Sequence, residues 1–213
     1  MDEGVSMAAP EKQVVATHKC VIIGDSNVGK SSFLVRFVRG EFSEQTRSTI
    51  SAAFLTRRVT AGDRTCEFQI WDTAGQERFR SLNTPMYYRG AKAALLLYDI
   101  SSAASFENIK GWFTQITMCG DKGCVLAIVG NKSDLEDKRE VPAADGRSFA
   151  EAHNLLFFES SAQSGAGIEE TFAAIAQLIP DSAPPAPPTA APKSIKLTLP
   201  DGSCMGGRKR SCC

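Results

Sequence analysis

The residues most able to do chemistry form the run Gly24-Asp25-Ser26-Asn27-Val28-Gly29-Lys30-Ser31, followed by Ser32. This run matches the pattern Gly-x4-Gly-Lys-Ser/Thr, in which backbone N–H groups wrap around a polyphosphate at a helix N-terminus. The pattern predicts that Lys30 reaches the β- and γ-phosphates and that the Ser31 hydroxyl binds Mg²⁺. A glycine-rich turn without a ligand is the alternative.

A second candidate follows the apolar run that ends at Trp71. Mg²⁺ prefers oxygen ligands and keeps several waters, so Asp72 is expected to hold the ion through water. Gly75 can bring a backbone N–H close to a γ-phosphate. Asp-x-x-Gly alone is common, and it gains weight here because it follows the phosphate motif.

A third candidate is the segment Asn131-Lys132-Ser133-Asp134. A carboxylate at Asp134 can accept hydrogen bonds from N1–H and the exocyclic amine of guanine, whereas adenine offers no such donor pair. This selects GTP or GDP over ATP. Asn131 is expected to tie its loop to the phosphate loop, and the stem of Lys132 to lie over the base. Asn131-x-Ser133 also fits a glycosylation acceptor, which a cytosolic chain excludes.

The segment Glu159-Ser160-Ser161-Ala162-Gln163 follows the next apolar strand. Backbone groups of Ser161, Ala162 and Gln163 are expected to contact the base oxygen.

These motifs, in this order, resemble the Ras superfamily of small GTPases over roughly residues 19–179. Within it the Rab branch is most similar, on Ser48-Thr49-Ile50-Ser51-Ala52-Ala53-Phe54, Phe68-Gln69-Ile70-Trp71, Arg78-Phe79-Arg80 and Tyr87-Tyr88-Arg89-Gly90-Ala91. Thr49 to Phe54 and Pro85-Met86-Tyr87-Tyr88 resemble the early-endosomal Rab five group.

The resemblance implies further roles. Thr49 binds Mg²⁺ and contacts the γ-phosphate, Phe42 packs on the guanine edge, and Gln76 orients the hydrolytic water, so that Gln76, Lys30 and Thr49 form the catalytic set. The implied effector surface consists of Phe54, Trp71 and Tyr87. From strand position alone, Phe54 and Trp71 are expected in the core.

Four departures from the family pattern stand out. Ser51 replaces a glycine, which stiffens the first switch, and Gln163 replaces the lysine of Ser-Ala-Lys. Asn27 occupies a position that tunes hydrolysis. The stretch between Glu77 and Tyr87 is one residue longer than usual.

The elements that must position these residues follow from apolar runs and helical periodicity. Strands are predicted over 19–23, 52–60, 64–71, 93–99, 124–129 and 155–158, and helices over 31–39, 104–118, 142–153 and 168–179. Residues 52–71 indicate an antiparallel hairpin. Continuous apolar strands that alternate with helices indicate an α/β fold with a parallel sheet covered on both faces. The resemblance specifies a P-loop NTPase G domain, with six mostly parallel strands and one antiparallel strand.

The expected organisation has four parts: a flexible arm over 1–17, a GTP-binding domain over 18–179, a Pro/Ala-rich tether over 180–207 and a basic tail over 208–213. Seven of the ten prolines lie between Pro180 and Pro200. This composition favours a semi-rigid linker, and a groove-binding Pro-x-x-Pro ligand is the alternative.

The terminal Cys212-Cys213 resembles the double-cysteine end on which Rabs carry two geranylgeranyl groups. One lipid chain gives marginal membrane binding, and stable anchoring takes two signals. Arg208-Lys209-Arg210 adds attraction to an anionic leaflet. An unmodified polar tail is the alternative.

The 213 residues carry 24 basic and 24 acidic side chains, a balance that gives no sign of a nucleic-acid binder. Seven cysteines without Cys-x-x-Cys spacing argue against a zinc site or a disulfide framework. The N-terminus is acidic and lacks an apolar secretory segment.

The sequence thus predicts a monomeric, membrane-attached switch that binds GTP or GDP with Mg²⁺. It would act in endocytic vesicle traffic at the cytoplasmic face of early endosomes, with a cytosolic pool. Its expected partners are effectors, an exchange factor, a GTPase activator and lipid-chaperone proteins. Hydrolysis should be slow, since no arginine finger in cis can be assigned. A GTP-locked scaffold with negligible turnover is the alternative. An ATP-driven enzyme is a third, less favoured alternative.

Overall fold

A computed structural model of the chain describes residues 16–43, 53–72 and 87–180. Its strands are β1 (Ala16–Ile23), β2 (Ala53–Ala61), β3 (Arg64–Asp72), β4 (Ala91–Asp99), β5 (Val125–Asn131) and β6 (Leu156–Glu159). Its helices are α1 (Lys30–Arg39), α3 (Ala103–Glu107), α4 (Ile109–Cys119), the 3-10 helix η2 (Ser133–Lys138), α5 (Ala143–His153) and α6 (Ile168–Leu178).

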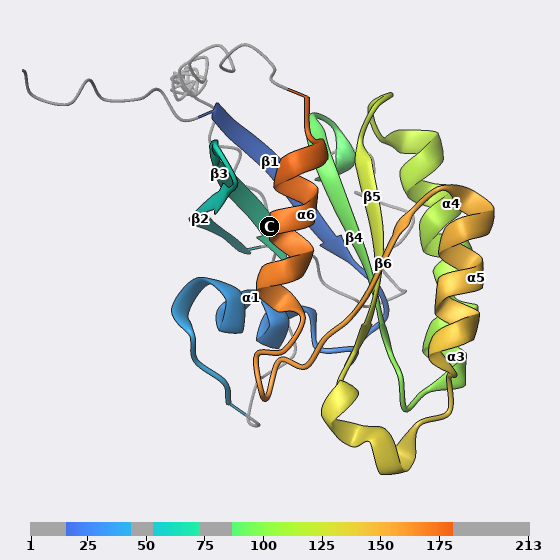
Figure 1. The fold of residues 1–213 in the computed structure, drawn as a ribbon. Coiled ribbons are helices and arrows are strands. Elements are labelled where there is room, and N and C mark those ends of the chain that lie inside the picture. The colour runs from blue at the N-terminus through green and yellow to red at the C-terminus, as the bar shows by residue number, and fades with distance from the viewer. Residues whose placement is uncertain (1–15, 44–52, 73–86, 181–213) are drawn as a thin grey trace, which may run out of the picture.

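The strands form one sheet in the order β2-β3-β1-β4-β5-β6 (Figure 1). Only β2 runs antiparallel to its neighbour, β3, and the other described pairs are parallel. This confirms the predicted fold class. The pairing places Asp72 opposite Ile22 and Asp99 opposite Asn131. The carboxyl ends of β3, β1, β4, β5 and β6 therefore meet at one edge of the sheet, where α/β proteins bind ligands.

Helices cover both faces of the sheet, with α1 and α6 on one side and α3, α4 and α5 on the other (Figure 1). The first core contains Phe37 and Phe172, whose rings stack with centroids 3.7 Å apart. The second contains Tyr98 and Trp112. Because the second half of β1 and most of β4 are covered on both faces, residues 20–23 and 93–98 are continuous apolar runs rather than alternating ones.

The structure divides the helix predicted over 104–118 into α3 and α4, with Asn108 between them. Gly111 N–H bonds to the carbonyl of Asn108, which tightens the turn where α4 begins. The Asn108 side chain donates to Asp25 Oδ2 at 2.6 Å, and Trp112 Nε1 donates to Asp25 Oδ1 at 2.8 Å. The break therefore aims two side chains at the phosphate loop, and helical periodicity alone could not have located it. The helix η2 was not predicted, because its residues are mostly polar.

The end of α6 is fastened to the β2–β3 hairpin. Arg64, the first residue of β3, donates from Nη1 to the carbonyl of Gln177 at 2.9 Å and from Nη2 to that of Ile179 at 2.7 Å. These bonds satisfy carbonyl groups that the end of a helix leaves without intrahelical partners. The chain reaches Pro180 directly after this point.

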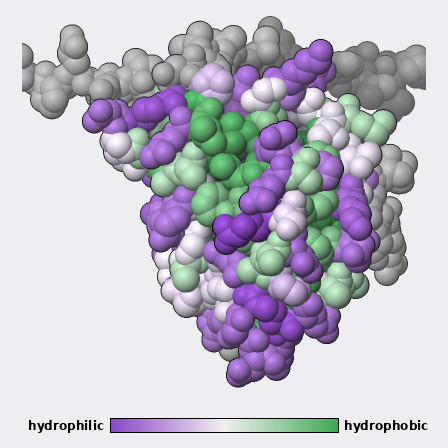
Figure 2. Space-filling model, turned by 45° about the vertical axis from the view of Figure 1, so that its right-hand side comes forward, coloured by the Kyte–Doolittle hydropathy of each residue, from purple (hydrophilic) through white to green (hydrophobic). Residues whose placement is uncertain are grey.

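The surface shown in Figure 2 is mainly polar, with apolar residues in an interrupted patch. Within the described ranges, the cysteines Cys20, Cys66, Cys119 and Cys124 are free thiols. No helix in those ranges combines the length and apolar character needed to cross a membrane.

Candidate nucleotide-binding site

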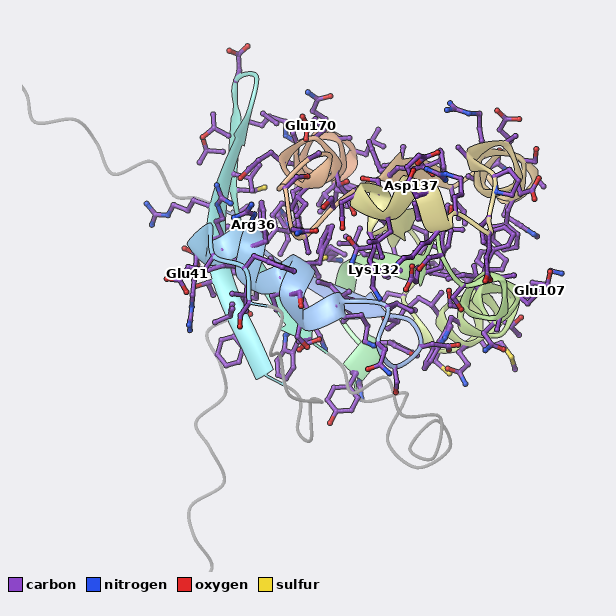
Figure 3. The ribbon with its side chains drawn as sticks, turned by 90° about the horizontal axis from the view of Figure 1, so that it is seen from below. Arg36, Glu41, Glu107, Lys132, Asp137 and Glu170 are labelled. Atoms are coloured by element: carbon purple, nitrogen blue, oxygen red, sulfur yellow. The ribbon has the colours of Figure 1, made fainter. Side chains whose placement is uncertain are left out.

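The predicted phosphate and base motifs converge on the carboxyl edge of the sheet, at the lower end of Figure 1. The phosphate loop leads from β1 into α1, Asp72 ends β3, Asn131 ends β5, and Ser161 and Ala162 follow β6. Figure 3 views this edge from below, with Lys132 near its middle and Arg36 on α1.

The phosphate loop is packed against the base-recognition loop at Gly29. The backbone of Gly29 has φ 89°, and a Cβ there would lie 2.5 Å from Asn131 Nδ2. Only glycine fits this close approach. Asn27 also lies in the left-handed region, at φ 65°. Asparagine tolerates that conformation better than most residues, so this departure from the family pattern keeps the loop geometry.

Lys30 is buried beneath the phosphate loop, with 6% of the residue exposed. Its Nζ donates to the main-chain carbonyl of Asp25 at 2.6 Å. Burial lowers the pKa of the Lys30 ammonium to about 8, against the opposing influence of Asp72 and Asp25. A buried ammonium group poised at the start of a helix is suited to receive an anion.

Ser31 and Asp72, the two described residues predicted to hold Mg²⁺, lie together. The Ser31 hydroxyl donates to Asp72 Oδ2 at 2.5 Å, and only 5% of Asp72 is exposed. One hydroxyl and one carboxylate are hard oxygen donors of the kind that Mg²⁺ prefers. The donor set therefore fits Mg²⁺.

Asn131 joins the base-recognition loop to the phosphate loop. Its Nδ2 donates to the carbonyl of Val28 at 2.9 Å, and its Oδ1 accepts from the hydroxyl of Ser160 at 3.2 Å. Asn131 and Ser160 are both fully buried. Three segments of the site are thus fixed to one another by a single amide.

We expect Asn131→Ala to lower the free energy of unfolding by about 1–3 kcal/mol, since it leaves the Val28 carbonyl buried without its donor. In a domain of this size the melting temperature should fall by several degrees. Thermal unfolding measures the change. Gln177→Ala, which truncates an exposed amide side chain on α6, is the matched control and should melt like wild type. Equal melting temperatures for all three proteins would contradict the role given to Asn131.

Asp134 lies at the exposed side of the same edge. Its Oδ1 accepts a hydrogen bond from the hydroxyl of Ser161, whose Oγ also accepts from Ser164 N–H at 3.0 Å. Ser161 and Ala162 are buried. Asp134 is therefore oriented by a residue of the other predicted base-contact segment.

The backbone of Lys132 adopts the left-handed conformation, with φ 65°, and its side chain passes Gly29 of the phosphate loop, where an added Cβ would lie 3.9 Å from Lys132 Cε. Its Nζ forms an ion pair with Asp99 Oδ2 at 2.6 Å. Asp99 Oδ1 accepts from both the backbone N–H and the hydroxyl of Ser101. Sequence reasoning missed Asp99, although a buried carboxylate that ends an apolar strand was the available signal.

Arg139 is a second residue that the sequence did not reveal. Its guanidinium pairs with two carboxylates, contacting Glu159 at 2.7 and 3.1 Å and Glu136 at 2.8 and 2.7 Å. The hydrogen bonds that Arg139 donates to Glu136 and then to Glu159 raise the pKa of Arg139 further above its ordinary value. Because Glu159 precedes Ser160 and Glu136 lies in η2, Arg139 joins the two base-recognition segments from outside.

The three predicted effector residues lie side by side, Phe54 on β2, Trp71 on β3 and Tyr87 in the helical turn that precedes β4. The rings of Phe54 and Trp71 stack with centroids 5.4 Å apart, and Tyr87 is 6.5 Å from Trp71. Phe54 is 55% exposed, so the expectation that it lies in the core is wrong. Lys19 Nζ lies 5.0 Å from the centroid of Trp71 and donates to the carbonyl of Arg89.

Two other predicted site residues are exposed. Phe42, expected to pack on the guanine edge, is 37% exposed beyond the end of α1. Gln163 is exposed as well, and its main-chain carbonyl accepts a hydrogen bond from Arg36. The predictions for Thr49, Ser51, Gly75, Gln76, Cys212 and Cys213, and for the extra residue between Glu77 and Tyr87, lie outside the described residues.

Comparison with known proteins identifies the family. Residues 19–181 match the description "Ras family". The chain is 43% identical over 195 residues to "Ras-related protein Rab5" of Nicotiana tabacum, covering 92% of this chain and 94% of the relative. It is 44% identical over 196 residues to "Ras-related protein Rab-5A" of Dictyostelium discoideum, with the same coverage. It is 42% identical over 206 residues to "Ras-related protein RABF2b" of Arabidopsis thaliana, covering 97% and 98%. The chain therefore belongs to the Ras family as a Rab5-like small GTPase that hydrolyses GTP to GDP and phosphate.

Proposed function

We propose that this GTPase is a membrane-anchored switch for endocytic vesicle traffic, which acts at the cytoplasmic face of early endosomes. A role in vesicle traffic follows from the Rab5-like family. The observation that carries the nucleotide-dependent switch is the junction of a phosphate site with a guanine site at one sheet edge, where Asn131 bonds to Val28. The Rab5 names of its relatives support the endocytic assignment.

In this proposal each part of the site has a separate task. Lys30 releases the Asp25 carbonyl and binds the β- and γ-phosphates, while backbone N–H groups of residues 24–32 surround them. Ser31 would hold Mg²⁺ directly and Asp72 would hold it through water, and the ion would supply positive charge that offsets the charge of the phosphates. Asp134 accepts the two guanine donors, while the backbones of Ser161, Ala162 and Gln163 contact the base oxygen.

Hydrolysis is proposed to depend on residues of the two switch segments. Gln76 orients the attacking water, and Thr49 and Gly75 contact the γ-phosphate, so that both segments are released after cleavage. Because no arginine finger in cis can be assigned from the sequence, intrinsic turnover is expected on the order of 10⁻⁴ s⁻¹, and an activator could add up to ~10⁵-fold.

The alternative of a GTP-locked scaffold rests on Ser51, Asn27 and the longer second switch. Single-turnover hydrolysis, measured with and without a Rab GTPase activator, separates the two functions. An accelerated single turnover supports the switch. Intact GTP binding with no acceleration supports the scaffold.

The surface of Phe54, Trp71 and Tyr87 is proposed to bind effectors in the GTP state. Large aromatic rings that are partly exposed provide apolar contact area at low conformational cost, which is typical of interface centres. The exposed Phe54 and its stack on Trp71 support this assignment.

Membrane attachment is proposed to require prenyl groups on Cys212 and Cys213, with the basic residues Arg208, Lys209 and Arg210 as a second signal. We expect the double variant Cys212→Ser with Cys213→Ser to be diffuse in the cytosol, whereas the tagged wild-type chain marks early endosomes. Fluorescence microscopy with an endosomal marker measures the difference. Cys204→Ser, in the same segment, is the matched control and should localise like wild type. Endosomal localisation of the double variant would refute the anchor.

A further inference from the structure

A guanidinium group on α1 contacts both chain segments that flank the proposed guanine pocket. Arg36 lies half-buried in the last turn of α1. Its Nη1 donates to the carbonyl of Gly40 at 2.7 Å, and its Nη2 donates to the carbonyl of Gln163 at 2.5 Å. Gly40 precedes Phe42 by two residues, and Gln163 belongs to the loop after β6. One side chain therefore links the two segments that are proposed to flank the guanine base.

On the first side, Arg36 holds Gly40 twice. The Gly40 N–H donates to the main-chain carbonyl of Arg36 at 2.9 Å, while the Gly40 carbonyl accepts from the Arg36 side chain. Gly40 adopts φ 72° and ψ 8°, which turns the chain out of α1. This closed pair of bonds sets the direction in which the chain leaves the helix toward Phe42.

On the second side, the loop after β6 is shaped to receive the guanidinium. The loop is closed by hydrogen bonds from Ser161 N–H to the Ala166 carbonyl at 3.0 Å and from Gly165 N–H to the Ser161 carbonyl at 2.8 Å. A Cβ at Gly165 would lie 3.2 Å from Arg36 Nε and 3.7 Å from Cζ. Because Gly165 has no side chain, the guanidinium can lie directly against this loop.

The contact with Gln163 does not depend on the side chain at that position, because the acceptor is the main-chain carbonyl. Gln163 stands where the family pattern has lysine. The bond from Arg36 therefore holds the loop in place despite this substitution.

We propose that Arg36 is a positioning residue that clamps the two sides of the guanine pocket and slows nucleotide dissociation. This inference rests on the proposed nucleotide site. A planar guanidinium can donate in two fixed directions at once, which a lysine ammonium on a flexible stem cannot do with the same geometry. With the clamp absent, the segment that carries Phe42 and the loop that carries Ala162 can move apart.

The test is the dissociation rate of a fluorescent GDP analogue, measured in excess unlabelled GDP on the full chain. We expect Arg36→Ala to dissociate about tenfold faster than wild type, as for the loss of a charge-assisted hydrogen bond. Arg36→Lys should remain faster than wild type, and it provides a milder variant should Arg36→Ala fold poorly. Arg39→Ala removes an exposed arginine from the same turn and should match wild type.

Repeating the measurement in EDTA distinguishes the base side from the phosphate side. Removal of Mg²⁺ accelerates dissociation of every variant, but the ratio of Arg36→Ala to wild type should stay the same. A wild-type rate for Arg36→Ala, even with a lower melting temperature, would reduce Arg36 to a helix cap and overturn the clamp. If the ratio of the Arg36→Ala rate to the wild-type rate fell to one in EDTA, that result would also overturn the clamp. Failure of the wild-type chain to bind GDP would instead refute the proposed nucleotide site.

Discussion

Asp134→Asn should lower the affinity for GDP at least ~10³-fold, because a site built around specific hydrogen bonds strongly rejects a ligand that leaves them unmade. The asparagine amide offers one acceptor and one donor where guanine presents two donors. Xanthine presents N1–H and a carbonyl oxygen at the same edge, which match the amide. The variant should therefore gain affinity for xanthosine diphosphate as it loses affinity for GDP. Competition between the two nucleotides for a fluorescent analogue measures the exchange of preference.

The fold should survive this substitution, since the amide oxygen of asparagine can still accept the hydrogen bond from Ser161. Asp137→Asn is the matched control, because Asp137, labelled in Figure 3, is also an exposed aspartate in η2. It should bind GDP as wild type does. If Asp134→Asn kept wild-type affinity for GDP, Asp134 would not be the residue that selects the base.

Lys30→Met should weaken GDP binding by about 100-fold, since it removes the charge-assisted hydrogen bonds to phosphate. It should not lower the stability of the nucleotide-free protein, because burying the Lys30 ammonium costs free energy that a methionine does not incur. Equilibrium binding and thermal unfolding of the nucleotide-free chain measure the two effects. Lys138→Met, at an exposed position of η2, should change neither.

The lowered pKa of Lys30 predicts that both the free energy of unfolding and the nucleotide affinity depend on pH. Burial lowers the pKa of Lys30 from 10.5 to about 8, so between these values the unfolded chain holds more protons and the free energy of unfolding rises with pH. Bound phosphate favours the charged form of Lys30. At a pH where Lys30 has lost its proton, nucleotide binding is therefore coupled to the uptake of a proton. The ratio of wild-type to Lys30→Met affinity should therefore fall as pH rises from about 7 to about 9. A ratio independent of pH would contradict the lowered pKa.

The sequence predicted most of the elements because the fold rests on apolar runs. β4 and β5 are buried on both faces and carry almost continuous apolar residues, so their positions could be recognised from composition. The order of the motifs then indicated one sheet edge, since parallel strands bring their carboxyl ends together. The junction of Asn131 with the phosphate loop, predicted from the motif, is present as a hydrogen bond to Val28.

Two of the features that sequence reasoning missed are pairings over long separations. Arg36 and Gln163 are 127 positions apart, and Asn108 and Asp25 are 83 apart. An arginine in the last turn of a helix is ordinary in sequence, because it also suits the helix dipole. Its role emerges only when the tertiary structure brings a second carbonyl within reach. The break between α3 and α4 has the same origin, since its side chains bond to Asp25.

The two hydrogen bonds from Arg64 to the end of α6 affect how the domain would respond to a mechanical pull. A pull on the chain beyond Pro180 first reaches the end of α6, where the carbonyls of Gln177 and Ile179 are bonded to Arg64. Tension is therefore shared with β3, next to the centre of the sheet, instead of peeling the last turn of α6 away from its end. If the residues after Pro180 act as the proposed tether, a pull on them would reach β3 as well as α6, and the nucleotide edge lies at the far end of β3.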